Sequence, residues 1–93
     1  MRRAARIDTV QPLIVETLRK AGATVQHLHM VGHGCPDLGV GYQGKSYFLE
    51  VKAPGGKLTK DERAWHEAWQ GQVAIVHTPE EALEAIGAAV YVT

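Results

Sequence analysis

Two acidic residues and a lysine have the types and spacing that chemistry on a phosphate needs. Asp37 follows Cys35 and Pro36, and Glu50 and Lys52 come thirteen and fifteen positions after it. Hard carboxylate oxygens are the ligands that Mg²⁺ prefers, and this ion completes its shell with water and substrate phosphate. A neighbouring ammonium can stabilise charge that develops on a phosphate. The three residues therefore form a candidate site for metal-assisted hydrolysis of a phosphodiester bond.

A predicted β-hairpin would bring these residues together. Two apolar runs, 38–42 and 46–51, are joined across Gln43 and Gly44, which is typical of a hairpin with a two-residue turn. The turn length fixes the register, so the numbers of paired residues sum to 87. This register places the start of the first strand opposite the end of the second.

In this register Asp37 lies directly opposite Glu50, with Cβ atoms about 4.5–5.5 Å apart. The two-residue period of a strand returns Lys52 to the same face as Glu50. Like charges directly opposite each other destabilise a sheet. Lys52 offsets part of this repulsion, and a divalent cation would offset more.

The rest of the chain predicts an α/β domain. We expect a helix over 8–21, a strand over 24–31, the hairpin, a helix over 59–71, a strand over 72–77, a helix over 78–87 and a short strand or subunit contact over 88–92. Residues 1–7 are interpreted as a basic arm that is either solvated or in contact with phosphate. Residues 8–93 then form a single domain.

The helix over 8–21 has an apolar face and a proline near its start. The face comprises Val10, Leu13, Ile14, Thr17, Leu18 and Ala21. Pro12 is expected in the first turn, where its missing N–H costs least. Asp8 and Gln11 lie off this face. One interpretation is that Asp8 is the N-cap of the helix and Gln11 closes its capping box.

The helix over 59–71 begins with a second capping signal. Thr59 and Glu62 have the spacing of a capping box. Its predicted apolar stripe consists of Ala64, Trp65, Ala68 and Trp69, and both tryptophans are expected in the core. His66 is interpreted as a residue of the helix flank that stacks on a neighbour.

Composition bounds the protein to one small globular domain. The chain has 93 residues, 45% hydrophobic and 22% charged, and a formal net charge of zero. Its one cysteine, Cys35, allows no disulfide within the chain, which fits a reducing cytosol. Without a long apolar run we expect no membrane span and a cytoplasmic location. Zero net charge is unusual for a nucleic-acid binder, so local basic clusters have to supply the contacts.

A zinc site is an alternative use of the histidines. His27, His29, His33 and Cys35 offer four ligands within nine residues. Their spacing is not a common structural zinc pattern, and all four come from one short segment. A polar strand face is the simpler interpretation of His27 and His29.

Four segments together resemble a known nuclease family. They are Gly34-Cys35-Pro36-Asp37-Leu38, Leu49-Glu50-Val51-Lys52, Leu58-Thr59 and Gly71-Gln72-Val73. They resemble the VRR-NUC type of the PD-(D/E)XK nuclease superfamily and the small phage and archaeal Holliday-junction resolvases. The match runs from about Asp8 to Ile86. It implies a restriction-endonuclease-like core, in the order helix, three strands, helix, strand, helix, with a mixed sheet flanked by helices.

The resemblance also implies roles for individual residues. Asp37 and Glu50, with the carbonyl of Val51, would hold Mg²⁺ or Mn²⁺, and Lys52 would position or activate the attacking water. Relatives place a polar residue of the first helix at the site, which points to Gln11 or Asp8, and a glutamine early in the second helix, where this chain has Glu62. The remaining candidates are Lys57, Lys60, Arg63 and Arg6 for DNA contacts, and His33 as a further site residue.

The implied activity is that of a metal-dependent DNA endonuclease selective for branched DNA of the Holliday-junction type, working as a homodimer. Two alternatives stay open from the sequence. One is a DNA-binding module on the same fold that has lost its chemistry. The other is a structural or metal-binding interaction domain, which zero net charge favours. A salt-dependent affinity for DNA separates the last from the first two.

Overall fold

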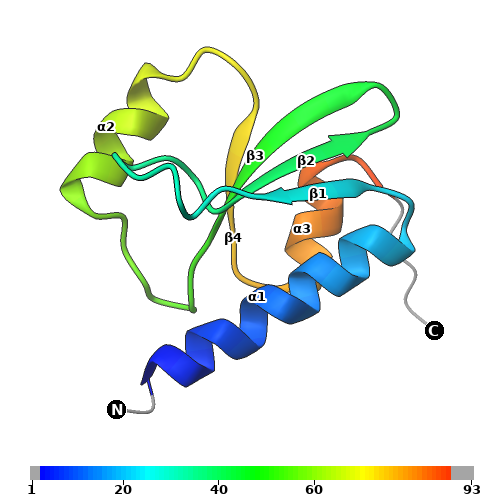
Figure 1. Cartoon of the computed structure of the whole chain (residues 1–93), viewed down its shortest axis with the longest axis horizontal. Coiled ribbons are helices and arrows are strands. Elements are labelled where there is room, and N and C mark those ends of the chain that lie inside the picture. The colour runs from blue at the N-terminus through cyan, green and yellow to red at the C-terminus, as the bar shows by residue number, and fades with distance from the viewer. Residues whose placement is uncertain (1–2, 89–93) are drawn as a thin grey trace.

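The expected order of elements is confirmed in a computed structural model, which describes residues 3–88, with side chains from residue 10 onward. The elements are α1 (Arg3–Lys20), β1 (Thr24–His27), β2 (Leu38–Tyr42), β3 (Lys45–Val51), α2 (Lys60–Ala68), β4 (Val73–Val76) and α3 (Pro79–Ala85). Figure 1 shows α1 running across the sheet, with α3 beside it and α2 at the opposite side of the strands.

The hairpin has the predicted turn and register. Gln43 and Gly44 form the turn with φ of 51° and 80°, the left-handed pair that a two-residue hairpin turn needs. Tyr42 pairs with Lys45, and at the far end of the ladder Leu38 pairs with Leu49. Every paired sum is 87, so the turn carries the register to the strand ends.

The sheet is mixed, as expected, with the order β1-β2-β3-β4. β1, β2 and β3 pair antiparallel, and β4 pairs parallel to β3 after a crossover through α2. β3 therefore has a hydrogen-bonded neighbour on both sides. Its residues have little freedom to move.

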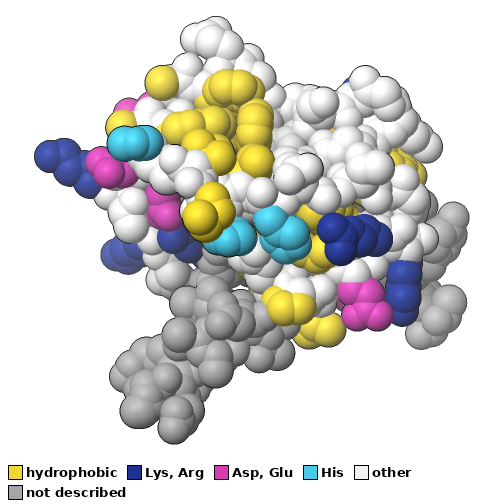
Figure 2. Space-filling view, viewed as in Figure 1, with side chains coloured by type: hydrophobic (Ala, Val, Ile, Leu, Met, Phe, Trp, Pro, Cys, Tyr) yellow, Lys and Arg dark blue, Asp and Glu magenta, His cyan; other side chains and the backbone are white. Residues whose placement is uncertain are grey.

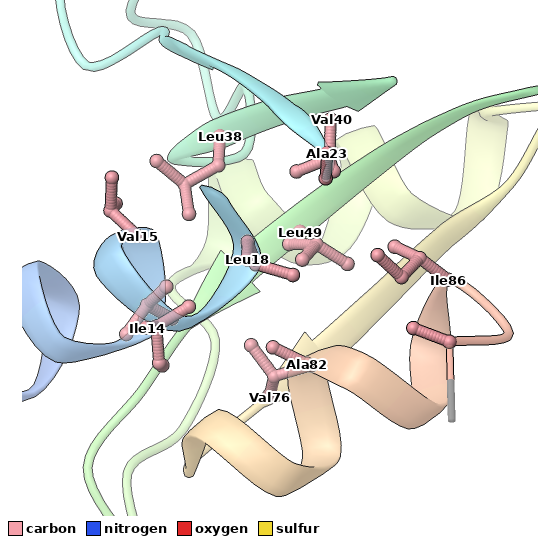
Figure 3. Packing of buried hydrophobic residues seen from close by; sticks show 12 residues of the cluster. Ile14, Val15, Leu18, Ala23, Leu38, Val40, Leu49, Val76, Ala82 and Ile86 are labelled. Atoms are coloured by element: carbon pink, nitrogen blue, oxygen red, sulfur yellow. The ribbon is translucent and has the colours of Figure 1, made fainter. Parts of the chain in front are cut away.

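The hydrophobic core lies between one face of the sheet and the two helices α1 and α3. Figure 3 shows side chains of α1, of the strands and of α3 directed into one cluster. Its members are Ile14, Val15, Leu18, Ala23, Leu38, Val40, Leu49, Val51, Val76, Ala82, Ile86 and Ala88. Alternate residues of β2 and β3 supply it, which leaves Glu50 and Phe48 on the opposite face, toward α2.

Helix α1 differs from the prediction at its N-terminal end. It begins at Arg3 rather than at residue 8, so most of the expected arm is helical and Pro12 lies in the helix interior. The alternative with Asp8 as N-cap is wrong for the same reason. The buried face is also rotated, because Val15 is buried while Leu13 is 49% exposed. Gln11 thereby lies at the edge of the buried face.

Strand β1 is shorter than predicted. It ends at His27, although the N–H of Leu28 still donates to the carbonyl of Asp37 at 2.8 Å. The chain then turns, with Val31 N–H bonded to the carbonyl of Leu28 and positive φ at Gly32. This turn ends the alternating pattern that suggested a longer strand.

Helix α2 has the predicted capping box but a different inner face. Thr59 Oγ1 accepts from the Glu62 N–H, and Glu62 Oε1 accepts from the Thr59 N–H. The face toward the sheet carries Glu62, Trp65 and His66, which are half-buried. The alanines of the predicted stripe, Ala64 and Ala68, are exposed.

The two tryptophans of this helix are not in the core. Trp65 and Trp69 stack at 4.8 Å between ring centroids, and both rings meet the edge or face of Phe48. Trp69 stays 41% exposed. This aromatic cluster fastens α2 to β3 from outside the main core.

The C-terminal helix α3 has its predicted cap. Thr78 Oγ1 accepts from the Glu81 N–H, and Pro79 occupies the first helical position. The predicted final strand or subunit contact over 88–92 lies, apart from Ala88, outside the described residues. In the part of the chain that is described, no helix has the length and apolar character that a membrane crossing requires.

Candidate active site

Asp37, Glu50 and Lys52 lie together in one pocket of about 350 Å³. The complete lining is Gln11, Asp37, Glu50, Val51, Lys52, Ala53, Gly56, Lys57 and Glu62. We call this the acidic pocket, because three carboxylates face it against two lysines. The side chains come from the end of β3, from the residue just before β2, from α1 and α2, and from the loop between β3 and α2.

Asp37 is locked at the end of the hairpin ladder. The ladder ends with the pair Leu38 and Leu49, and Asp37 is the residue just before Leu38. Its Oδ2 accepts from the Val51 N–H at 2.8 Å. The carboxylate therefore takes the backbone donor that would otherwise continue the ladder. This bond holds the carboxylate beside the carboxyl-terminal end of β3.

Among the side chains that the structure describes, Glu50 is the one charged group that is buried, with 2% of its surface exposed. It lies on the central strand β3, and its Oε1 has no hydrogen-bond partner. Burial, together with the charge and hydrogen bond of Asp37 and the charge of Glu62, raises the pKa of Glu50 to about 8, although Lys52 acts the other way. An unpartnered buried oxygen is costly unless something compensates it.

Lys52 is held by Glu62 more closely than by Glu50. Its Nζ lies 2.8 Å from Glu62 Oε1 and 3.9 Å from Glu50 Oε2. Burial alone would lower the pKa of Lys52, but the hydrogen bond and charge of Glu62, with the other two carboxylates, raise it above its ordinary value. Lys52 is therefore a charged hydrogen-bond donor across the whole physiological range of pH.

Glu62 has both of the roles that the sequence offered as alternatives. It closes the capping box of α2 and also pairs with Lys52 in the acidic pocket. Burial would raise its pKa, but the bonds from Lys52 and from the Thr59 N–H lower it. The carboxylate is ionised and fixes both the helix start and the lysine.

The structure brings some of the other predicted residues to the pocket and leaves others away from it. Gln11 and Lys57 line it, whereas Lys60 and Arg63 are exposed on α2 and do not. His33, which the sequence offered as a further site residue, lines a separate pocket with Asp61, Ala64 and Trp65. Its φ is positive, 57°. The side chains of Arg6 and Asp8 lie outside the description.

His66 belongs to the site although its sequence context did not indicate this. Its Nε2 lies 3.6 Å from Glu50 Oε1, and 13% of its side chain is exposed. Burial lowers the pKa of His66. Only the spacing of four from Glu62, which puts both on one helix face, could have suggested the contact.

The donors in the acidic pocket fit a hard divalent cation. The carboxylates of Asp37 and Glu50 line one pocket together with Val51, and Glu50 is 2% exposed, so little water can screen the two acidic groups from each other. Among the described residues no three His, Cys, Asp or Glu side chains gather as a metal cluster. The zinc set of His27, His29, His33 and Cys35 is thus not brought together, whereas Mg²⁺ needs only one or two carboxylates.

A comparison with solved structures identifies the fold. A solved VRR_NUC domain superposes on this chain with a TM-score of 0.70 and 25% sequence identity, over 88% of this chain and 91% of the other. This chain has the VRR_NUC fold. VRR_NUC domains are a nuclease family of the PD-(D/E)XK type, so the fold and the resemblance expected from the sequence are confirmed. Comparisons with protein-family models and with curated proteins gave no match.

Proposed function

We propose that this VRR_NUC-like domain is a divalent-metal-dependent nuclease that hydrolyses phosphodiester bonds in DNA. The fold it shares with VRR_NUC domains supports the reaction class. One observation supports the metal site more than any other. Glu50 is 2% exposed on a central strand and shares a pocket with Asp37, so two carboxylates meet where little water can screen their charges.

Asp37 and Glu50 would hold the cation, with the carbonyl of Val51 as a further ligand. A bound Mg²⁺ or Mn²⁺ supplies Lewis-acid polarisation of the phosphate and a more acidic water for attack. The protein contributes the placement. The Val51 N–H fixes the Asp37 carboxylate, and the paired strand β3 fixes Glu50.

Lys52 would orient the attacking water and stabilise the negative charge that grows on the phosphate. Its raised pKa suits it to donate hydrogen bonds rather than to accept a proton. Glu62 holds its ammonium at the pocket, and Gln11 adds a neutral polar group from α1.

A larger groove adjoins the acidic pocket and suits a nucleic-acid strand. It has a volume of about 1000 Å³ and shares Gln11 with the pocket. Its lining includes Arg19, His27 and His29 together with Lys20, which is paired with Glu16 at 3.2 Å. Figure 2 shows histidine and basic side chains along the boundary between β1 and α1. Local positive charge of this kind can bind phosphates despite a net charge of zero.

The preferred substrate is proposed to be branched DNA, cut by a homodimer. A domain of this size cannot enclose a duplex, and two copies would present two active sites to a four-way junction. Sedimentation in dilute solution tests the dimer. A monomer that cleaves at full rate would contradict it.

The direct test is cleavage of labelled four-way junction, flap, linear and single-stranded DNA with Mg²⁺, Mn²⁺ or a chelator. The wild type should cut in the presence of metal only. Glu50→Gln and Lys52→Ala should each abolish cutting and retain the fold by circular dichroism. Glu67→Gln, on the exposed side of α2, is the matched control and should cut normally. Full activity of either site variant would contradict the assignment.

A further inference from the structure

Two polar atoms in the described side chains are buried without a hydrogen-bond partner, and they face each other. They are Glu50 Oε1 and His66 Nε2, which lie 3.6 Å apart. Buried polar atoms are nearly always paired, and each exception needs a physical reason. Here one reason serves both atoms, since each is the nearest available partner of the other.

The rest of α2 holds His66 at this place. The capping box fixes the helix start, and Glu62, one turn before His66, is tied to Lys52 across the pocket. On the other side Trp65 packs edge-on against Phe48 and meets the His66 ring at 6.0 Å. The imidazole therefore has little room to turn away from Glu50.

We propose that His66 is a positioning residue that orients the Glu50 carboxylate for the cation. Its Nε2–H donates to Oε1, so that Oε2, which lies on the side of Lys52, is the oxygen that would bind the metal. A hydrogen bond spans about 2.7–3.2 Å, so the two side chains need to approach by about half an ångström. The inference rests on the proposed metal site and goes beyond it, because it names a group outside the ligand set. Mutation of a group that hydrogen-bonds to a metal ligand typically lowers the metal affinity about 10–100-fold.

Two variants of His66 separate hydrogen bonding from packing. His66→Phe keeps the ring and its contact with Trp65 but removes the donor. His66→Gln loses the ring but places an amide N–H near the position of Nε2. Mn²⁺ alone is titrated calorimetrically into chelator-stripped wild type, both variants and the exposed control Glu67→Gln.

We expect His66→Phe to weaken Mn²⁺ binding about tenfold or more. The Mn²⁺ affinity of His66→Gln should stay within a few-fold of that of the wild type, and the Glu67→Gln control should equal the wild type. In cleavage assays His66→Phe should raise the Mn²⁺ concentration for half-maximal rate, with an unchanged KM for DNA at saturating metal. Equal Mn²⁺ affinity in His66→Phe and wild type overturns the positioning role, as does an equal loss in both His66 variants.

The same experiment keeps the two proposals distinguishable. A wild type that binds no Mn²⁺ overturns the metal site itself and the role of His66 with it. If the wild type binds Mn²⁺ and His66→Phe binds it with the same affinity, only the role of His66 is overturned. If His66→Phe does not fold, long-range ¹H–¹⁵N spectra of the wild-type imidazole with Mg²⁺ decide. A protonated Nε2 that shifts as Mg²⁺ is added supports the proposal, and a bare Nε2 refutes it.

Discussion

Replacing Glu50 by glutamine should stabilise the metal-free protein at alkaline pH, although it destroys the proposed metal site. The buried carboxylate ionises only with difficulty, because burial and the nearby charges of Asp37 and Glu62 raise its pKa to about 8. An amide of nearly the same shape never ionises. The variant therefore avoids a cost that the wild type incurs as pH rises.

The direction of the pH dependence follows from proton linkage. Between the ordinary pKa of 4.5 and about 8, the folded state holds a proton on Glu50 that the unfolded state has released. The contribution of Glu50 to stability is therefore fully present below pH 4.5 and is lost as pH rises through 8. At about 1.4 kcal/mol per pH unit this difference sets an upper bound of about 5 kcal/mol. Relaxation and water entry reduce it, so we expect about 2 kcal/mol.

The assay is urea denaturation followed by tryptophan fluorescence, in chelator, at pH 5 and pH 9. The quantity of interest is the free energy of unfolding of Glu50→Gln minus that of the wild type. It should increase by about 2 kcal/mol from pH 5 to pH 9. Titrating groups that do not contact Glu50 are common to both proteins and largely cancel.

Two further measurements make this test specific. Glu67→Gln removes an exposed carboxylate from the side of α2 that faces away from the site. The difference in unfolding free energy between this variant and the wild type should not change with pH. Mg²⁺ at pH 9 should stabilise the wild type and leave Glu50→Gln unchanged. A Glu50→Gln difference that is the same at both pH values would refute the reasoning about the buried carboxylate.

Three other substitutions test neighbouring parts of the site. Asp37→Asn keeps an oxygen for the backbone N–H of β3, so circular dichroism should show a retained fold. Metal-dependent cleavage should fall by at least a hundredfold. Near-normal cleavage would contradict a ligand role for Asp37. Glu62→Gln keeps the capping acceptor, so the free energy of unfolding should change by less than about 1 kcal/mol. Because it removes a charge, the pKa of Lys52 measured by NMR should fall, and DNA should bind more tightly. An unchanged Lys52 pKa would show that Glu62 does not hold Lys52. Lys57→Glu should weaken DNA binding and flatten its salt dependence, whereas Lys45→Glu, at the distant hairpin turn, should change neither; equal effects of the two would exclude a local contact.

The site carboxylates could be predicted from sequence because their placement depends on local rules. A two-residue turn fixes the register of its hairpin, and the register places Asp37 against Glu50 with no information from the rest of the chain. The strand period then places Lys52. The structure has this register as far as the Leu38–Leu49 pair, and it places Asp37, Glu50 and Lys52 in one pocket.

The inner face of α2 could not be predicted in the same way. Its apolar residues favour a stripe of alanines and tryptophans, yet the helix is rotated so that Glu62 and His66 face the sheet. The contacts that set this rotation are made with Phe48 of β3 and with Lys52, which directly follows β3, and both lie outside the helix. Periodicity within one helix carries no information about such partners.

The first helix shows a different limit. Pro12 is most favourable in a first turn, which predicted a start near residue 8, but the helix continues back to Arg3. A proline in a helix interior removes one backbone hydrogen bond and is tolerated where the remaining turns hold. His33 shows the same limit as α2, because it lines a separate pocket with residues of that helix, and the sequence around it carries no information about that contact.

The central claim is that Asp37 and Glu50 together bind a divalent cation. Anomalous diffraction from a crystal soaked in Mn²⁺ measures this directly. We expect a peak within bonding distance of both carboxylates and near the carbonyl of Val51. A crystal whose acidic pocket holds no anomalous peak, or whose Mn²⁺ lies instead at His27 and His29, would contradict the account.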